Sequence, residues 1–395
     1  MKIISKNILF SASLLLIFAI SGCNKKNTEP KSEEIPEILL QIEENKTHSW
    51  YYFTPSGFKK TDLPQNAPQT EEAPWTEAIR ISSAGNSSAL NEEITAYAVV
   101  NRLGLLTFEN EKITLSHDGN FFDGRTAGNL VFQNSAPVFS VYKSSFFNES
   151  LSDSDSDSLF LIHFEPSAGI FYSLVNTSNL TDTPNSEVTD FFWDGYNWTC
   201  SIKSKNDDKY SFDYFYWQNG INLLDLKPTN ASSNITISRV NQNEFRKLKS
   251  DKPYSEAPQR IKNLTENLAQ KKSFLINIKT AGGASPQKYF NQVRNSAFEE
   301  KYLNATAILS KSWSAALFED GTLYLEGALS GKYILRDGKT VALRLPKLPA
   351  GFIYSDFVIS GTTLYAAWEE NSFYKTSRSG FISVNLDKTL YSELQ

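Results

Sequence analysis

The stretch "TDFFWDGYNWTCSIKS", residues 189–204, holds the pattern that decides the fold. Phe191 and Trp193 lie two residues apart, the pair Asp194-Gly195 follows, and Trp198, Cys200 and Ile202 continue the two-residue spacing. Successive side chains of a strand point to opposite faces of a sheet, and Asp-Gly adopts the tight turn that joins two antiparallel strands. The stretch therefore predicts a β-hairpin that turns at residues 194–195.

The same pattern returns elsewhere in the chain. It is clear in "SDFVISGTTLYAAWEE", residues 355–370, and weaker in "AGNLVFQNSAPVFSVYKS", residues 127–144. When the first two stretches are superposed, Asp190-Phe191 corresponds to Asp356-Phe357. A recurring hairpin of this kind indicates an internal repeat.

A second pair of segments also matches. Residues 97–115 and 306–325 both contain an apolar strand, a polar turn, a second apolar strand, an acidic turn and a third strand. Further strands follow several of the hairpins, for example at 209–217. Units of three or four antiparallel strands in series are typical of the blades of a β-propeller. The first turns of the candidate units fall near residues 101, 134, 194, 242, 310 and 360.

These units predict an all-β protein. We expect a β-propeller of about seven blades, with six or eight as alternatives, and tandem β-sandwiches as the rival fold because short strands at regular spacing fit both. A closed ring leaves no unpaired sheet edge, so the strand around Trp50 should pair in the sheet formed by residues 373–391.

One region departs from the strand pattern. Residues 255–303 predict a helix, a strand and a second helix, in that order. Ile261, Leu264 and Leu268 share one face of the first helix, and Tyr289 and Phe290 belong to the apolar face of the second. We expect this excursion to cover a face or edge of one blade, with docking of a partner as the alternative.

The N-terminus has the features of an export signal. Lys2 and Lys6 precede an apolar run from Ile8 to Ile20, and the sequence Ile20-Ser21-Gly22-Cys23 follows. This stretch resembles the lipobox of bacterial lipoproteins, with Ile where Leu is usual. The resemblance implies that residues 1–22 are a signal peptide and that the thiol of Cys23 carries lipid.

The resemblance also implies where in the cell the protein lies. Residues 23–37 are polar and predict a solvated, lipidated tether ahead of a β-propeller domain at 38–395. The membrane is thus an expected partner, through the N-terminal lipid. Asn24 stands where Asp commonly retains such lipoproteins in the inner membrane, which favours the outer membrane, with the periplasmic or surface face undecided. The chain as a whole resembles propeller-type lipoproteins of spirochaetes.

Cys200 is the second of two cysteines. If Cys23 carries lipid, the exported domain has no disulfide, and the alternation around Cys200 predicts a small buried hydrophobe. A nucleophilic role would need a neighbouring base, and no Cys-His signature is present.

Charge and motifs narrow the function. The chain has 39 Lys and Arg against 44 Asp and Glu, and loss of the signal removes Lys2 and Lys6, which leaves 37 − 44 = −7. This acidity argues against nucleic acid as a partner. "LSDSDSDSL", residues 151–159, lacks the Gly and Glu of a calcium loop, and the three histidines lack metal-ligand spacing, so we expect no metal, no cofactor and no catalytic residue.

The aromatic stretch "KYSFDYFYW", residues 209–217, is the most suggestive binding element. A strand packed between blades must be apolar on both faces, which explains such a stretch without a ligand. The alternative is stacking on carbohydrate or peptide. We name Tyr196, Tyr214 and Trp217 as the candidate ligand-facing aromatics.

Two functions follow. The first is a membrane-anchored, non-catalytic binding or assembly scaffold with an envelope protein or glycan as its partner. The second is a glycosidase or lyase that acts on envelope glycans, with two carboxylates in the propeller funnel. Fold alone does not decide between them.

Overall fold

The structure is a computed structural model, and it places most of the strand-forming segments of the chain. The chain divides at Glu37/Ile38, and the larger unit runs from Ile38 to Gln395. The described residues are 39–41, 48–54, 56–68, 80–83, 96–100, 103–109, 112–116, 126–133, 136–142, 160–165, 170–176, 186–193, 198–206, 209–217, 237–248, 251–280, 287–293, 302–310, 312–329, 333–334, 341–371 and 378–386.

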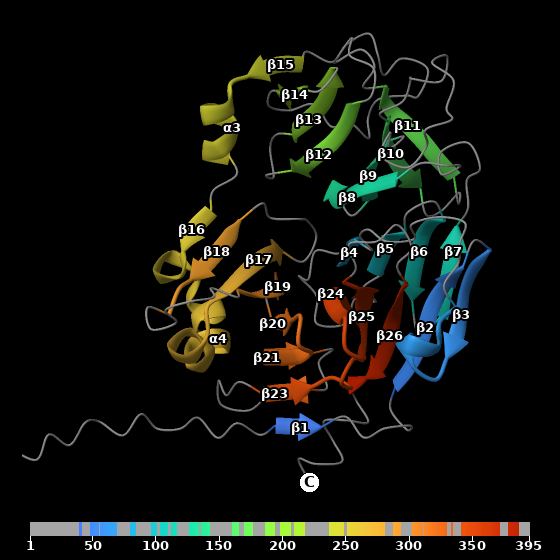
Figure 1. Ribbon diagram of the computed structural model, residues 1–395, viewed down its shortest axis with the longest axis vertical. Helices are drawn as coiled ribbons and strands as arrows, with labels where there is room; N and C mark the ends of the chain where they lie inside the picture. The colour runs from blue at the N-terminus through green and yellow to red at the C-terminus, as the bar shows by residue number, and fades with distance from the viewer. Residues whose placement is uncertain are drawn as a thin grey trace, which may run out of the picture. The chain divides into compact units, whose positions relative to one another are not determined.

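Three four-stranded antiparallel sheets follow one another along the chain (Figure 1). In each sheet the strands pair in chain order, so each is a simple meander. The first sheet contains β4 (Arg80–Ser83), β5 (Ala96–Val100), β6 (Gly104–Glu109) and β7 (Lys112–Ser116). The second contains β8 (Thr126–Gln133), β9 (Ala136–Tyr142), β10 (Phe160–Glu165) and β11 (Ile170–Asn176). The third contains β12 (Ser186–Trp193), β13 (Trp198–Asn206), β14 (Lys209–Trp217) and β15 (Ile237–Val240).

These sheets confirm the hairpins predicted from the repeat. β12 and β13 pair antiparallel with Trp193 opposite Trp198, which confirms the hairpin, and the predicted turn at Asp194-Gly195 lies outside the described residues. β8 and β9 form the equivalent hairpin in the second sheet. Cys200 lies opposite Phe191 and is fully buried, which confirms the prediction of a small core residue.

A fourth sheet, here called the closing sheet, joins the two ends of the domain. Its strand order is β24-β25-β26-β2-β3. β2 pairs antiparallel with β26, which confirms that the strand around Trp50 pairs with the C-terminal strands. The bounds are β2 (His48–Thr54), β3 (Gly57–Thr61), β24 (Phe352–Ser360), β25 (Thr363–Glu370) and β26 (Ser379–Asn385), and a short 3-10 helix η1 (Pro64–Asn66) follows β3.

The fifth sheet, here called the large sheet, has nine strands among the described residues, in the order β1-β23-β21-β20-β19-β17-β18-β16, with β22 paired to β21. Its meander β19-β20-β21 matches β5-β6-β7, as the second sequence repeat predicts. Its bounds are β1 (Leu39–Gln41), β16 (Asp251–Pro253), β17 (Phe274–Thr280), β18 (Lys288–Asn291), β19 (Leu303–Leu309), β20 (Trp313–Phe318), β21 (Thr322–Leu329), β22 (Tyr333–Ile334) and β23 (Val341–Arg344).

The region 255–303 follows the prediction only in its first half. A 3-10 helix η5 (Tyr254–Glu256), the helix α4 (Gln259–Lys271) and the strand β17 match the expected helix and strand. The second expected helix is wrong at Lys288–Asn291, where β18 pairs with both β17 and β16. Tyr289 is buried and Phe290 is exposed, because neighbouring residues of a strand point to opposite faces. β17 is an interior strand of the large sheet, so the region is part of the sheet and not an appendage.

Helix α4 covers one face of the large sheet (Figure 1). Its buried side chains Ile261 and Leu264 share a core with strand residues such as Phe274 and Phe318. Thr265 is also buried, and its hydroxyl donates to the Ile261 carbonyl at 2.7 Å, so the buried polar group is satisfied within the helix. The apolar face that the sequence predicts therefore fixes how α4 lies on β20 and β21.

The turn expected near residue 242 is wrong. Helix α3 (Gln242–Leu248) begins there, after β15. The side chain of Asn241 accepts hydrogen bonds from the backbone N–H groups of Asn243 and Glu244, and Glu244 in turn accepts from the Asn241 N–H. This reciprocal capping box stabilises a helix start where the alternation alone had indicated a strand turn.

Neighbouring sheets share cores. Ile308 and Leu317 of the large sheet pack with Phe357 and Trp368 of the closing sheet. On its other face, the closing sheet packs through Tyr365 against Phe108 of β6, with ring centroids 4.2 Å apart. β24 also contacts β4, β4 contacts β8, and β8 contacts β12. The first strands of successive sheets thus contact one another along the series.

Candidate functional site

An irregularity of the strand pairing recurs at one place in three of these first strands. The register of β12 shifts between Val188 and Asp190, and that of β24 shifts between Tyr354 and Asp356. β8 carries the same kind of shift against β9. Such bulges re-aim side chains and are common at functional positions of sheets. Asp190 and Asp356, which the sequence repeat aligns, therefore each lie directly after a bulge.

Asp356 forms the most buried ion pair of the described residues. The Nζ atom of Lys279 lies 2.5 Å from both carboxylate oxygens, and the side chains are 17% and 4% exposed. The backbone N–H of Phe357 also donates to Asp356 Oδ1 at 2.8 Å. Lys279 belongs to β17 and Asp356 to β24, so the pair joins the large sheet to the closing sheet.

This geometry limits the chemistry of Asp356. Both of its oxygens accept hydrogen bonds from one ammonium group, so the positive charge of Lys279 balances the negative charge of the carboxylate. A general base or a metal ligand needs an oxygen directed at a ligand. The pair therefore acts as a joint between two sheets.

The aromatic strand β14 presents a second candidate surface. Phe212 is 50% exposed, the largest exposed fraction among the large apolar side chains that the structure describes as exposed. Tyr214, two residues on, is half-buried, and its ring lies 4.6 Å from the Phe245 ring of α3. One aromatic ring of the strand is thus open to solvent while the next is held under a helix.

The opposite face of β14 is fixed by charge and packing. Arg239 of β15 lies 3.1 Å from Asp213 and places its guanidinium 5.7 Å from the centre of the Phe215 ring. Phe215 is buried. These contacts hold in place the strand that carries Phe212, so the exposed Phe212 ring extends from a well-packed strand.

The named aromatics have different outcomes. Tyr196 lies outside the described residues, and Trp217 is placed on β14 by its backbone, with its side chain outside the described part. Tyr214 keeps a partly exposed ring, so its ligand-facing role stays a prediction. The exposed residue that sequence reasoning did not single out is Phe212, since alternation identifies a face but not which of its positions a helix covers.

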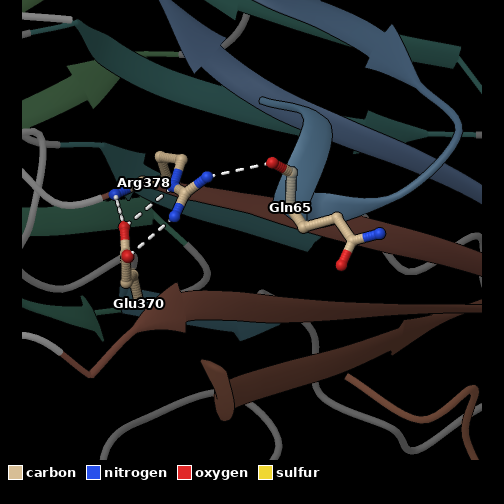
Figure 2. Close-up of polar contacts among 3 residues, drawn as sticks. All are labelled: Gln65, Glu370 and Arg378. Carbon is tan, nitrogen blue, oxygen red and sulfur yellow. Dashed lines mark hydrogen bonds and ion pairs between the residues drawn. The ribbon is translucent and has the colours of Figure 1, made fainter. Parts of the chain in front are cut away.

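A third cluster lies at the end of β25 (Figure 2). Arg378 donates from Nη2 and Nε to the two oxygens of Glu370 at 2.8 and 2.9 Å, and from Nη1 to the Gln65 carbonyl at 2.9 Å. Its guanidinium lies 5.0 Å from the centre of the Phe352 ring. The cluster ties η1 to the strands on either side of residues 371–378 in the closing sheet.

The contacts within this cluster favour the charged forms of both Glu370 and Arg378. The hydrogen bonds from Arg378 lower the pKa of Glu370 below its ordinary value, and the same bonds raise the pKa of Arg378. A general acid of a glycosidase needs a raised pKa. The pKa of Glu370 is shifted in the opposite direction.

Metal-type residues do not gather in the part of the chain that the structure describes: no group of three or more His, Cys, Asp or Glu is placed to hold an ion there. His48 begins β2 and packs edge-on against Trp50, and His163 lies within β10 opposite Tyr172. His117, residues 151–159 and Cys23 lie outside the described residues. Of the helices that are described, none is long and apolar enough to cross a membrane.

Comparison with curated sequences gives a distant relative over most of the chain. The chain is 22% identical over 409 residues to an uncharacterized lipoprotein of Treponema pallidum (strain Nichols), covering 86% of this chain and 87% of that protein.

Solved structures give distant likenesses. A prolyl endopeptidase has a TM-score of 0.27 and 9% identity over 80% of this chain and 42% of its own. The polysaccharide lyase Uly1 has a TM-score of 0.23 and 11% identity over 74% of this chain and 56% of its own. Human WBSCR16 has a TM-score of 0.19 and 9% identity over 86% of this chain and 99% of its own. This chain thus spans less than two thirds of the first two structures.

The family comparison covers nearly the whole domain. The sequence matches DUF8086, a family of unknown function, over residues 40–388. This interval runs from β1 to just beyond β26, so it includes all five sheets and both ends of the closing sheet. The chain belongs to the DUF8086 family.

Proposed function

We propose that this protein is a lipid-anchored component of the bacterial envelope that binds a partner through the exposed surface of its β domain, without catalysis. The observation that carries the binding role is Phe212, an exposed aromatic ring on a strand whose neighbouring side chains are held in place. Aromatic side chains with rigid support are favoured anchors of interfaces, because they bury much area at small entropic cost.

Three of the acids that the structure describes support binding over glycan hydrolysis. Asp356 pairs with Lys279, Glu370 with Arg378 and Asp213 with Arg239. A glycosidase needs two carboxylates that face the same bond, one of them protonated. Each of these three acids forms an ion pair with a Lys or Arg side chain. A catalytic pair, which is the alternative function, would have to be formed by other acids of the chain.

The lipid anchor is supported by sequence. The Ile20-Ser21-Gly22-Cys23 stretch carries the lipobox pattern, and the Treponema relative is a lipoprotein. We expect labelling of cells with a fatty-acid analogue to mark the wild-type protein and to leave Cys23→Ser unmarked. Equal labelling of the two would remove the anchor from the proposal. The outer membrane is the favoured address.

A β-propeller is the proposed arrangement of the sheets. Three features support it: first strands that contact one another in series, a bulge at the same place in β8, β12 and β24, and a closing sheet built from both ends of the chain. Closure of this kind pairs β2 with β26, so neither of these strands is left as a free edge. The described residues form five sheets, and about seven blades stays a prediction for the whole chain.

The test of binding uses the lipidated protein in its own membrane. A tagged wild type is cross-linked and purified from detergent-solubilised envelope, beside Phe212→Ala and the matched control Leu63→Ala, an exposed apolar residue 39% exposed beyond β3. We expect wild type and Leu63→Ala to retain the same partner and Phe212→Ala to lose most of it. Binding to isolated envelope glycan, measured in parallel by sedimentation, assigns the partner as protein or glycan.

Two outcomes would contradict the proposal. The first is an unchanged yield of partner with Phe212→Ala. The second is cleavage of envelope glycan by the purified domain, abolished by one Asp or Glu substitution, which would establish the enzyme instead.

A further inference from the structure

The first described strand after the lipid site lies at one edge of the large sheet. Fifteen residues separate Cys23 from Leu39, where β1 begins. β1 pairs in parallel with β23, with Leu40 opposite Leu343 and Gln41 opposite Arg344. β23 pairs on its other side with β21, so β1 is the outermost strand of that edge.

This attachment point limits where the domain can lie. The chain between Cys23 and Leu39 can reach at most about 55 Å, because each residue adds no more than about 3.4 Å. A domain of this length has a width of about 50 Å, from the usual relation between chain length and radius of gyration. To place β1 on the side remote from the bilayer, the tether would have to extend to nearly its full length of about 55 Å. Such extension costs conformational entropy.

We propose that the edge of the large sheet formed by β1 and β23 faces the phospholipid surface, and that the pairing of β1 with β23 sets this orientation. The inference rests on the lipid attachment proposed for Cys23. Without the β1–β23 pairing, the tethered segment would extend from Cys23 to His48, the start of β2, and the closing sheet would become the point of attachment.

The charge of the tether does not explain this orientation, since the tether is nearly balanced. Between Cys23 and Leu39 it has three basic and four acidic residues, namely Lys25, Lys26, Lys31, Glu29, Glu33, Glu34 and Glu37. A balanced segment gives little net attraction to anionic lipid. The approach of this edge to the bilayer should therefore persist at high ionic strength, because the covalent anchor and the position of β1 cause it.

The test compares two exposed lysines in the full-length lipidated protein on vesicles. Lys347 follows β23 in the loop after it, and Lys112 begins β7, the outer strand of the first sheet. Each is replaced by Cys and labelled with a fluorophore, and the vesicles contain phosphatidylglycerol and a lipid with a quencher in its headgroup. The buried thiol of Cys200 should label slowly in the native protein.

We expect several-fold stronger quenching at position 347 than at position 112, unchanged by high salt. Two further variants, each made in both labelled backgrounds, test the cause. Leu40→Pro removes a backbone N–H from β1 and should weaken its pairing. An insertion of Gly-Ser residues after Asn27, as long as the tether itself, leaves β1 intact. Both should reduce the difference between the two positions.

The outcomes separate this inference from the anchor itself. If the protein does not float with vesicles, the lipid anchor fails, and the proposed function fails with it. If it floats and the two positions are quenched equally, the orientation alone is wrong. If Leu40→Pro and the insertion both leave the difference unchanged, β1 does not set the orientation.

Discussion

Trp50 of β2 lies directly opposite Ile382 of β26 in an antiparallel pair of strands. Both side chains are buried in the core that the closing sheet shares with the large sheet. The N-terminal and C-terminal parts of the domain thus complete one sheet and one core. Loss of either strand would expose the edge of its neighbour as well as the apolar face.

Removal of residues from 373 onward should therefore abolish cooperative unfolding of the whole domain. The truncation deletes β26, which separates β25 from β2. Calorimetry of the soluble domain should show one transition for wild type and no comparable transition for the truncated protein. A control that ends after Leu386 keeps β26 and should melt like wild type. A melting temperature of the longer truncation equal to that of wild type would refute closure and favour separate sandwiches.

Gly380 of β26 should not tolerate a side chain. A Cβ atom there would lie 1.9 Å from the Tyr51 carbonyl oxygen and 2.6 Å from the Trp368 ring. Because both neighbours belong to packed strands, Gly380→Ala should lower the free energy of unfolding by about 3 kcal/mol. Gly361→Asn is the matched control in the β24–β25 turn, where φ is +58° and no atom lies within 4 Å of the added Cβ.

Asn accepts a left-handed backbone, so the control should change the free energy of unfolding by no more than about 1 kcal/mol. Urea titration at constant pH measures both variants. Equal losses for the two substitutions would mean that steric contact at Gly380 is not the cause.

Removing one partner of the Lys279–Asp356 pair should lower the free energy of unfolding more than replacing both partners by apolar residues. Asp356→Asn leaves the Lys279 ammonium largely buried, 17% exposed, without its counter-charge, and should lower the free energy of unfolding by about 3 kcal/mol. The double variant Lys279→Met with Asp356→Leu buries no charge and should be more stable than either single change. Urea titration of wild type, Lys279→Met, Asp356→Leu and the double variant gives the coupling energy. Additive effects would contradict a direct interaction.

The Glu370–Arg378 cluster should make stability depend on acid pH. The folded protein has a Glu370 pKa below the ordinary 4.5, so the contribution of this carboxylate is complete above about pH 5 and is lost as pH falls through the lowered value. Glu370→Gln should therefore be less stable than wild type at pH 7, and the difference should shrink toward pH 3. Urea midpoints across this range measure it. Arg378→Lys keeps the charge and loses the two-pronged contact, so it should lie between the two.

The hairpins could be predicted because their signals are local. Alternation on both sides of a turn predicts two paired strands, as in β12 and β13, and the repeat finds the same unit in β24 and β25. The same locality explains the errors. The stretch 288–291 is short, and its two aromatic residues Tyr289 and Phe290 fit a helix as well as a strand. Its pairing with β16 and β17 decides for strand. At Asn241 a capping box overrides the alternation that precedes it.

The sequence by itself determined the strand-rich class, the hairpins of the repeat, helix α4, the burial of Cys200 and the lipobox pattern at Cys23. Only the tertiary structure decided that β17 lies inside the large sheet, that Lys279 meets Asp356, and that Phe212 is exposed while Tyr214 lies beneath α3. The physical reason is the range of the forces involved. Backbone dihedral preferences and side-chain alternation act over a few neighbouring residues. Ion pairs and burial depend on segments that are far apart in the chain and come together only when the sheets pack.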